Sequence, residues 1–120
     1  KTDDVISYDA CQSAHQLNAH AIIAFTESGS TAGRVSKFRP KTPILALTPN
    51  EQVQRLLTIR WGVTPITIKT LSTVEDFFGE AKTKAMEIMG AQTGDKIVLV
   101  AGLPIGVAGG TNLMRILEII

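Results

Sequence analysis

Four hydroxyl side chains gather around one glycine in the segment TESGSTAG, residues 26–33. The four hydroxyls belong to Thr26, Ser28, Ser30 and Thr31. Gly29 lets the backbone come close to a ligand. The segment lies between an apolar run and the expected start of a helix, where free backbone N–H groups favour an anion. These residue types in this order predict a cradle for a phosphate group.

The charges near this segment favour the same chemistry, with one exception. Between Ser28 and Asn50 the sequence has no acidic residue but four cationic ones, Arg34, Lys37, Arg39 and Lys41. The exception is Glu27, whose carboxylate would repel a phosphate. A second interpretation stays open at this point, in which Ser30 or Thr31 only caps the helix and the cations form a solvated face.

A second glycine-rich segment, GLPIGVAGGT, covers residues 102–111 and has no helix of its own to donate N–H groups. Its position in the predicted fold makes it a candidate for ligand binding. In open α/β sheets, ligands bind beyond the carboxyl ends of the strands where the strand order reverses. If the first and fourth strands are neighbours, this segment faces the hydroxyl segment there. We therefore expect Gly106 and Gly109 to form the flexible wall of a small-ligand pocket.

Few other residues could do chemistry. His15 and His20 have no carboxylate or cysteine at metal-ligand spacing, which favours a surface or capping role. Cys11 lies among apolar helix residues without a basic neighbour, which predicts a buried and inert thiol. The acidic cluster of a response regulator and both nucleotide fingerprints, GxGxxG and GxxxxGK[ST], are missing.

Short apolar runs alternate with helical patterns along the chain. Strands are predicted at residues 21–25, 43–48, 63–68, 96–102 and 112–120. Helices are predicted to start at Thr2, at Ser30 or Thr31, after Asn50 and after Ser72 or Thr73, and Gly62 and Gly90 are expected to end the last two. Helical spacing directs one stripe of each helix to the core, and these stripes include Leu17, Leu56, Trp61 and Ile88.

Three strand–helix–strand repeats require parallel pairing with right-handed crossovers. The connection over residues 102–111 is too short and too rich in glycine for a crossover helix, so the final strand is expected to be antiparallel to its neighbour. The predicted fold is a three-layer α/β/α domain. Its five-stranded mixed sheet has the order 3-2-1-4-5, with the last strand antiparallel.

The composition limits the classes of function. With 120 residues, 44% of them hydrophobic, and a net charge of +1, the sequence fits one globular domain over residues 1–120 and excludes a disordered chain. A charge near zero argues against nucleic acid or an anionic membrane as partner. The uncharged stretch 97–114 is interrupted by glycines, a proline and polar residues, which argues against a membrane span.

The single cysteine and the first residues bear on the setting of the protein. One cysteine excludes a disulfide framework and is typical of a reducing compartment, so we expect a cytoplasmic protein. The N-terminal KTDDVISY has neither an initiator Met nor the basic start of a secretory signal. We expect the chain to be a piece of a longer protein.

Three ordered segments, FTESGSTA, FRPKTPILALTPN and VAGLPIGVAGGTNLMRI, resemble the C-terminal domain of pyruvate kinase. The resemblance covers essentially the whole chain, and the AGxPxGxxGxTN form is similar to bacterial members. It implies a regulatory domain of the fold just described, whose Thr-x-Ser-Gly-x-Ser/Thr loop binds a phosphorylated activator. That loop corresponds to Thr26, Ser28, Gly29 and Thr31 here.

The resemblance also implies where catalysis resides. In pyruvate kinases a separate barrel domain binds phosphoenolpyruvate, ADP and Mg and K ions, and none of that barrel is present in this sequence. We therefore expect this domain to hold no catalytic residue, no metal and no cofactor, and to work with the rest of a pyruvate kinase chain.

Two departures from the family bear on the activator. In relatives that respond to fructose 1,6-bisphosphate, the second loop position is often basic and the loop before the last strand carries Trp or Arg. Here these positions are Glu27 and the uncharged GLPIGVAGG, so a second phosphate would lack a counter-charge. The resemblance then implies a monophosphate such as AMP or a sugar phosphate, or no activator. The alternatives are a purely structural interaction domain and a stand-alone small-molecule-binding domain.

The last strand predicts self-association. Only Arg115 and Glu118 interrupt the apolar run of residues 112–120, and an apolar sheet edge invites pairing with another chain. The resemblance points the same way, because pyruvate kinases are usually tetramers whose C-terminal domains meet across a two-fold interface. We expect a homo-oligomer through Asn112 to Ile120. The alternative is a monomer whose edge is shielded by its own N-terminal helix.

Overall fold

The computed structural model describes residues 2–102, 105 and 110–120. Strands and helices alternate along the chain, as the apolar runs predict. In chain order the elements are α1 (Thr2–Gln16), β1 (Ala21–Phe25), α2 (Ser30–Lys37), β2 (Ile44–Thr48), α3 (Glu51–Leu57), β3 (Val63–Thr67), α4 (Val74–Met89), β4 (Lys96–Ala101) and β5 (Leu113–Glu118).

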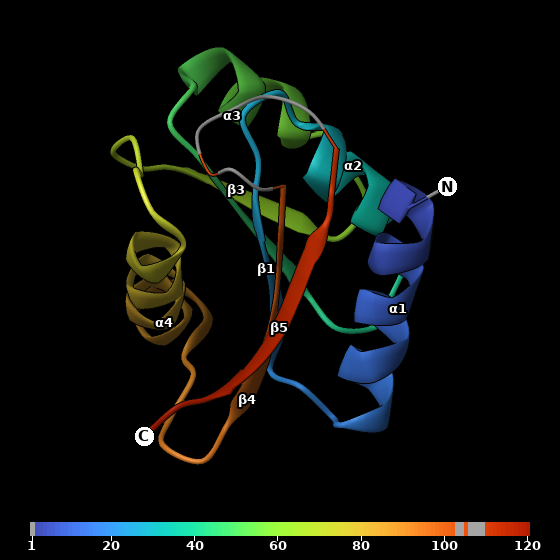
Figure 1. Ribbon diagram of the computed structural model, residues 1–120, viewed down its shortest axis with the longest axis vertical. Helices are drawn as coiled ribbons and strands as arrows, with labels where there is room; N and C mark the ends of the chain where they lie inside the picture. The colour runs from blue at the N-terminus through green and yellow to red at the C-terminus, as the bar shows by residue number, and fades with distance from the viewer. Residues whose placement is uncertain (1, 103–104, 106–109) are drawn as a thin grey trace.

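The strands form one mixed sheet in the order β3-β2-β1-β4-β5. β1 pairs in parallel with β2 and with β4, and β2 pairs in parallel with β3. β5 runs antiparallel to β4. Helix α4 covers one face of the sheet, and α1, α2 and α3 cover the other (Figure 1). The predicted three-layer architecture, strand order and antiparallel last strand are therefore confirmed.

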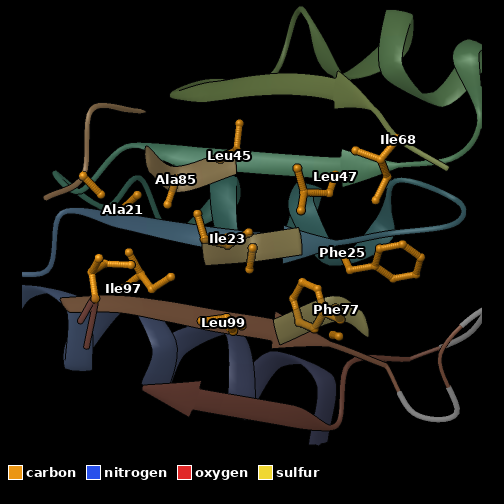
Figure 2. Close-up of a cluster of buried hydrophobic side chains, with 14 of the residues drawn as sticks. Ala21, Ile23, Phe25, Leu45, Leu47, Ile68, Phe77, Ala85, Ile97 and Leu99 are labelled. Atoms are coloured by element: carbon orange, nitrogen blue, oxygen red, sulfur yellow. The ribbon is translucent and has the colours of Figure 1, made fainter. Parts of the chain in front are cut away.

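The core has two halves, one on each face of the sheet. On β1, Ile23 and Phe25 contribute to the half under α4, while Ile22 and Ala24 contribute to the half under α1, α2 and α3. Figure 2 shows the first half, where the ring of Phe25 lies 5.9 Å from that of Phe77 between centroids. Because both faces are covered, β1 and β2 are unbroken apolar runs rather than alternating ones.

Local signals in the sequence determine several helix ends. The side chain of Asn50 accepts hydrogen bonds from the N–H groups of Gln52 and Val53 at the start of α3. Thr73 accepts one from the N–H of Asp76 at the start of α4. Gly90 ends α4 in a left-handed conformation with φ 71°. The predicted caps at Asn50, Thr73 and Gly90 are confirmed.

Four side chains that helical spacing assigned to the core are exposed instead, so this part of the prediction is wrong. Their exposed fractions are 38% for Leu17, 66% for Leu56, 44% for Trp61 and 44% for Ile88. Leu17 and Trp61 come after the ends of α1 and α3, where helical spacing no longer directs a side chain. Helix α3 ends at Leu57 with Thr58 as its C-cap, earlier than the predicted end at Gly62. Leu56 and Ile88 lie within helices, on flanks that no neighbouring element covers among the described residues.

Candidate functional site

The hydroxyl segment lies at the carboxyl end of β1, where the chain turns into α2. In the sheet β1 lies between β2 and β4. The chain reaches β2 directly after α2 but reaches β4 only much later, so the strand order reverses at β1. In Figure 1 the start of α2 lies close to the carboxyl end of β1. This is the position at which open α/β sheets bind ligands.

Gly29 gives the segment its shape. It immediately precedes α2 with φ 94°, a left-handed conformation that favours glycine. Its N–H donates to Thr26 Oγ1 at 2.8 Å, so this N–H is used inside the loop. A Cβ at Gly29 would lie 3.4 Å from Val53 Cγ1, which shows that the loop packs directly on α3.

Two of the four predicted hydroxyls lie at the surface. Ser28 is exposed and Ser30 is half-buried, and their Oγ atoms are 3.1 Å apart. The N–H of Ser30 points to Ser28 Oγ at 3.4 Å, a long and weak contact that a ligand oxygen could replace. Ser28 and Ser30 are therefore the groups of this loop that a ligand can reach.

The other two hydroxyls are directed inward. Thr26 and Thr31 are 3% and 4% exposed. Thr31 Oγ1 lies 2.9 Å from Thr111 Oγ1, in a buried pair that joins the start of α2 to the segment before β5. The two glycine-containing segments thus approach each other at Thr31 and Thr111. Gly106 and Gly109, predicted to line the pocket, lie outside the described residues.

Asp3 belongs to this junction, a contact that the sequence reasoning missed. Its Oδ1 accepts a hydrogen bond of 2.8 Å from the N–H of Thr111. Its Oδ2 lies 3.3 Å from Arg34 Nη2. The carboxylate is packed so closely on Gly110 that a Cβ there would overlap it. The only signal for this contact in the sequence is that residue 110 is a glycine.

The cations of the region are partly neutralised by the first turn of α1. Arg34 pairs with Asp3, and Lys37 Nζ lies 3.4 Å from Asp4 Oδ1. Arg60, which the sequence reasoning missed, comes from the turn after α3. Its Nη2 would lie 3.3 Å from a Cβ at Gly33, so its guanidinium rests on α2 at the position where a side chain is missing.

Two open grooves border the accessible hydroxyls. One of about 570 Å³ lies between the loop and α3, and its lining includes Ser28, Ser30 and Arg60. The other, of about 720 Å³, lies between α2 and the turn after α3. Ser30 and Arg60 line both grooves, as does Ile59. Two hydroxyls and a guanidinium form a donor set that suits the oxygens of one phosphate.

The remaining candidates are Cys11, His15 and His20. Cys11 is half-buried, its thiol contacts the carbonyl oxygen of Val35 at 3.7 Å, and burial raises its pKa from 9.0 to about 11. It is therefore a poor nucleophile near neutral pH. His20 contacts the carbonyl oxygen of Met89 and lies 3.5 Å from Asp95, while His15 is exposed.

The described residues show neither a metal-binding cluster nor a membrane-spanning helix. Within residues 2–102, 105 and 110–120, His, Cys, Asp and Glu side chains nowhere form a group of three or more that could hold a metal ion. Over the same residues, every helix is too short or too polar to cross a bilayer.

Comparison with known proteins gives matches over nearly the whole chain. The family model described as "Pyruvate kinase, alpha/beta domain" matches residues 4–117. The pyruvate kinase of Clostridium acetobutylicum is 44% identical over 115 residues, which are 96% of this chain and 24% of that protein. Pyruvate kinase 2 of Synechocystis is 45% identical over 113 residues, 94% of this chain and 19% of that protein.

A solved structure is similar in three dimensions as well. The crystal structure of a pyruvate kinase from Cryptosporidium parvum matches with a TM-score of 0.87 at 33% identity, covering 98% of this chain and 23% of that one. The chain thus spans about a quarter or less of the length of the relatives that it matches.

Proposed function

Because the chain belongs to the family of pyruvate kinase alpha/beta domains, we propose that it is the regulatory and oligomerisation domain of a pyruvate kinase. In this proposal residues 1–120 form one domain that takes up a phosphorylated activator at the loop from Thr26 to Thr31. The whole protein transfers the phosphoryl group of phosphoenolpyruvate to ADP, a step of glycolysis.

We place catalysis in the part of the relatives that this chain does not span. The chain covers 24% of the Clostridium acetobutylicum pyruvate kinase, which leaves room for a separate catalytic barrel with its Mg and K ions. This domain then needs no metal or cofactor of its own. A coupled assay of the 120-residue chain with phosphoenolpyruvate and ADP should give only background turnover.

The observation that carries the activator proposal is the pair of accessible hydroxyls, Ser28 and Ser30, at the carboxyl end of β1 and the start of α2. The N–H groups at a helix start favour an anion. Arg60, in the same groove, adds a guanidinium that can bond two phosphate oxygens. Together these groups supply donors from two elements for one phosphate.

The charge balance favours a monophosphate over a bisphosphate. Glu27 adds a negative charge within the loop, and Arg34 and Lys37 already pair with Asp3 and Asp4. These two cations are therefore less available to a second phosphate. AMP or a sugar monophosphate fits this balance.

Melting curves of the chain with AMP, glucose 6-phosphate and sulfate test the activator proposal. A compound that binds only the folded state raises the melting temperature with its concentration. We expect AMP or glucose 6-phosphate to do so, and Ser28→Ala together with Ser30→Ala to abolish the shift. Ser72→Ala, an exposed serine outside the loop, is the matched control. Equal shifts with sulfate and with the esters would mean an adventitious anion site.

One observation favours the second candidate function, a purely structural interaction domain without an activator. The hydroxyls of Thr26 and Thr31 are both bonded within the protein, so two of the four predicted hydroxyls already have partners. If this candidate is correct, no phosphate ester shifts the melting temperature, and the Ser28→Ala variant behaves as the unaltered chain does. Association through β5 would then be the function of the domain.

A further inference from the structure

The proposed activator loop is closed on its inner side by one buried hydrogen bond. Thr31 Oγ1 lies 2.9 Å from Thr111 Oγ1. The exposed fractions of the two residues are 4% for Thr31 and 0% for Thr111. Because both side chains are buried, neither hydroxyl can reach a ligand while the pair is intact. We call this pair of hydroxyls the 31–111 latch.

The two ends of the latch are held unequally. At Thr111 the N–H donates to Asp3 Oδ1 at 2.8 Å. The preceding Gly110 is packed so tightly that a Cβ on Gly102 would overlap its carbonyl oxygen. Thr31 lies in the first turn of α2, and threonine side chains in helices adopt two rotamers. Rotation of the Thr31 side chain therefore separates the pair while Thr111 stays in place.

A second polar group beside the latch lacks a partner. Arg34 follows Thr31 by three residues on α2, so the two side chains lie on the same side of the helix. Arg34 Nη2 lies 3.3 Å from Asp3 Oδ2. Its Nη1, however, is buried and donates no hydrogen bond to any residue that the structure describes. A buried donor without an acceptor costs free energy, and an anion beside it would remove that cost.

We propose that the 31–111 latch holds the loop in a low-affinity state, and that the phosphate of an activator opens it by accepting a hydrogen bond from the Thr31 hydroxyl. This inference rests on the proposed function, which places that phosphate at Ser28 and Ser30. In the open state Thr31 donates to the ligand, while the N–H of Thr111 stays bonded to Asp3. Separating the pair offsets part of the binding free energy, so the closed latch lowers the affinity of the loop.

Calorimetric titration of the 120-residue chain with AMP and with glucose 6-phosphate tests the latch. Thr111→Val removes one partner and leaves the Thr31 hydroxyl free for the phosphate. We expect it to bind about two- to tenfold more tightly, which corresponds to one hydrogen bond. Thr31→Val also breaks the latch but removes the donor itself, so it should bind no more tightly than the unaltered chain. Thr111→Ser keeps the hydroxyl and should bind as the unaltered chain does.

The matched control removes a threonine hydroxyl elsewhere. Thr73 Oγ1 accepts a hydrogen bond of 3.1 Å from the N–H of Asp76 at the start of α4. Thr73→Val should therefore lower stability without changing the affinity for either ester. Thr111→Ala is the second variant, should Thr111→Val fail to fold, because it removes the same hydroxyl without adding a methyl group in its place.

The outcomes separate the latch from the proposed function. If an ester binds the unaltered chain and Thr111→Val binds it equally or more weakly, the latch inference is wrong and the proposed function stands. The same holds if Thr31→Val gains affinity together with Thr111→Val, because the Thr31 hydroxyl would then not reach the ligand. If an ester binds only Thr111→Val, the latch is supported, but the unaltered chain has no activator and the second candidate function is favoured. If no ester binds any variant, both the latch and the activator proposal are contradicted.

Discussion

Thr31 is the residue whose role changes most between the sequence and the folded chain. Its place in the loop predicts a ligand hydroxyl, yet its Oγ1 faces Thr111 Oγ1 at 2.9 Å in the interior. A ligand can use this hydroxyl only after the Thr31–Thr111 pair separates. Ser28 and Ser30 need no such rearrangement. The residue types predict a cluster of hydroxyls in this loop, but the inward direction of the Thr31 hydroxyl depends on a partner 80 residues away in the sequence.

Gly29 is a residue at which a methyl group should cost stability. With φ 94° and Val53 Cγ1 at 3.4 Å from an added Cβ, Gly29→Ala is expected to lower the free energy of unfolding by about 1–2 kcal/mol. The matched control is Gly79→Ala in α4, where an added Cβ meets nothing within 4 Å. In a helix interior the same change should raise stability by up to about 1 kcal/mol. Urea unfolding measures both, and shifts of the same sign would contradict this account of Gly29.

Cys11 should be slow to react in the folded chain. Burial raises its pKa from 9.0 to about 11, so the thiolate is scarce at pH 8. Iodoacetamide labelling followed by mass spectrometry should be much slower for the native chain than for the chain in urea. Because the folded state favours the protonated thiol, this group contributes stability below about pH 9 and loses it as the pH rises toward 11. Equal labelling rates in the two states would show that the thiol is accessible.

At the scale of elements, the strands were predictable and the outer flanks of the helices were not. An unbroken run such as Ala21–Phe25 must be covered on both faces, and this constraint fixes the strand and its layer. For helices, spacing shows which residues share a side but not where the helix ends. Helical spacing directs Trp61 to the core only if the helix continues to Gly62, but α3 ends at Leu57. Trp61 is therefore 44% exposed instead of buried.

The junction between α1, α2 and the segment before β5 depends on Asp3. Asp3→Ala removes the acceptor for the part-buried N–H of Thr111 and the partner of Arg34, so we expect a loss of about 1–3 kcal/mol. Asp4→Ala is the matched control, since Asp4 sits next in the same turn and pairs with the exposed Lys37. Its loss should stay within about 0–1 kcal/mol. Equal losses for the two variants in urea unfolding would show that Asp3 acts only through the charge of the first turn.

At the scale of the whole molecule, the proposed activator loop and the expected self-association strand lie on different parts of the sheet. The accessible hydroxyls lie at the carboxyl end of β1, in the middle of the sheet, while β5 forms one margin of the sheet (Figure 1). An activator and a second copy of the chain could therefore bind without competing for the same residues.

Self-association is expected along β5, the last strand in the sheet order. A charge placed on β5 tests this expectation only where it leaves the core intact. Leu117 packs partly against the core under α4, so a charge there would disturb folding as well as association. Ile116 is 39% exposed, which makes Ile116→Lys the cleaner variant. A lysine on an edge strand opposes pairing with another chain, because its charge must stay in water.

We expect the chain to form a dimer as its concentration rises, and Ile116→Lys to shift that equilibrium to the monomer without a large change in melting temperature. Sedimentation velocity over a concentration series measures both chains. Ile88→Lys is the control, because Ile88 is exposed to a similar degree, 44%, but lies on α4 away from β5. The control should associate as the unaltered chain does. If the chain stays monomeric at the highest concentration, the edge of β5 is not a contact and α1 or another element shields it. If both lysines weaken association equally, the contact is not at the edge of β5.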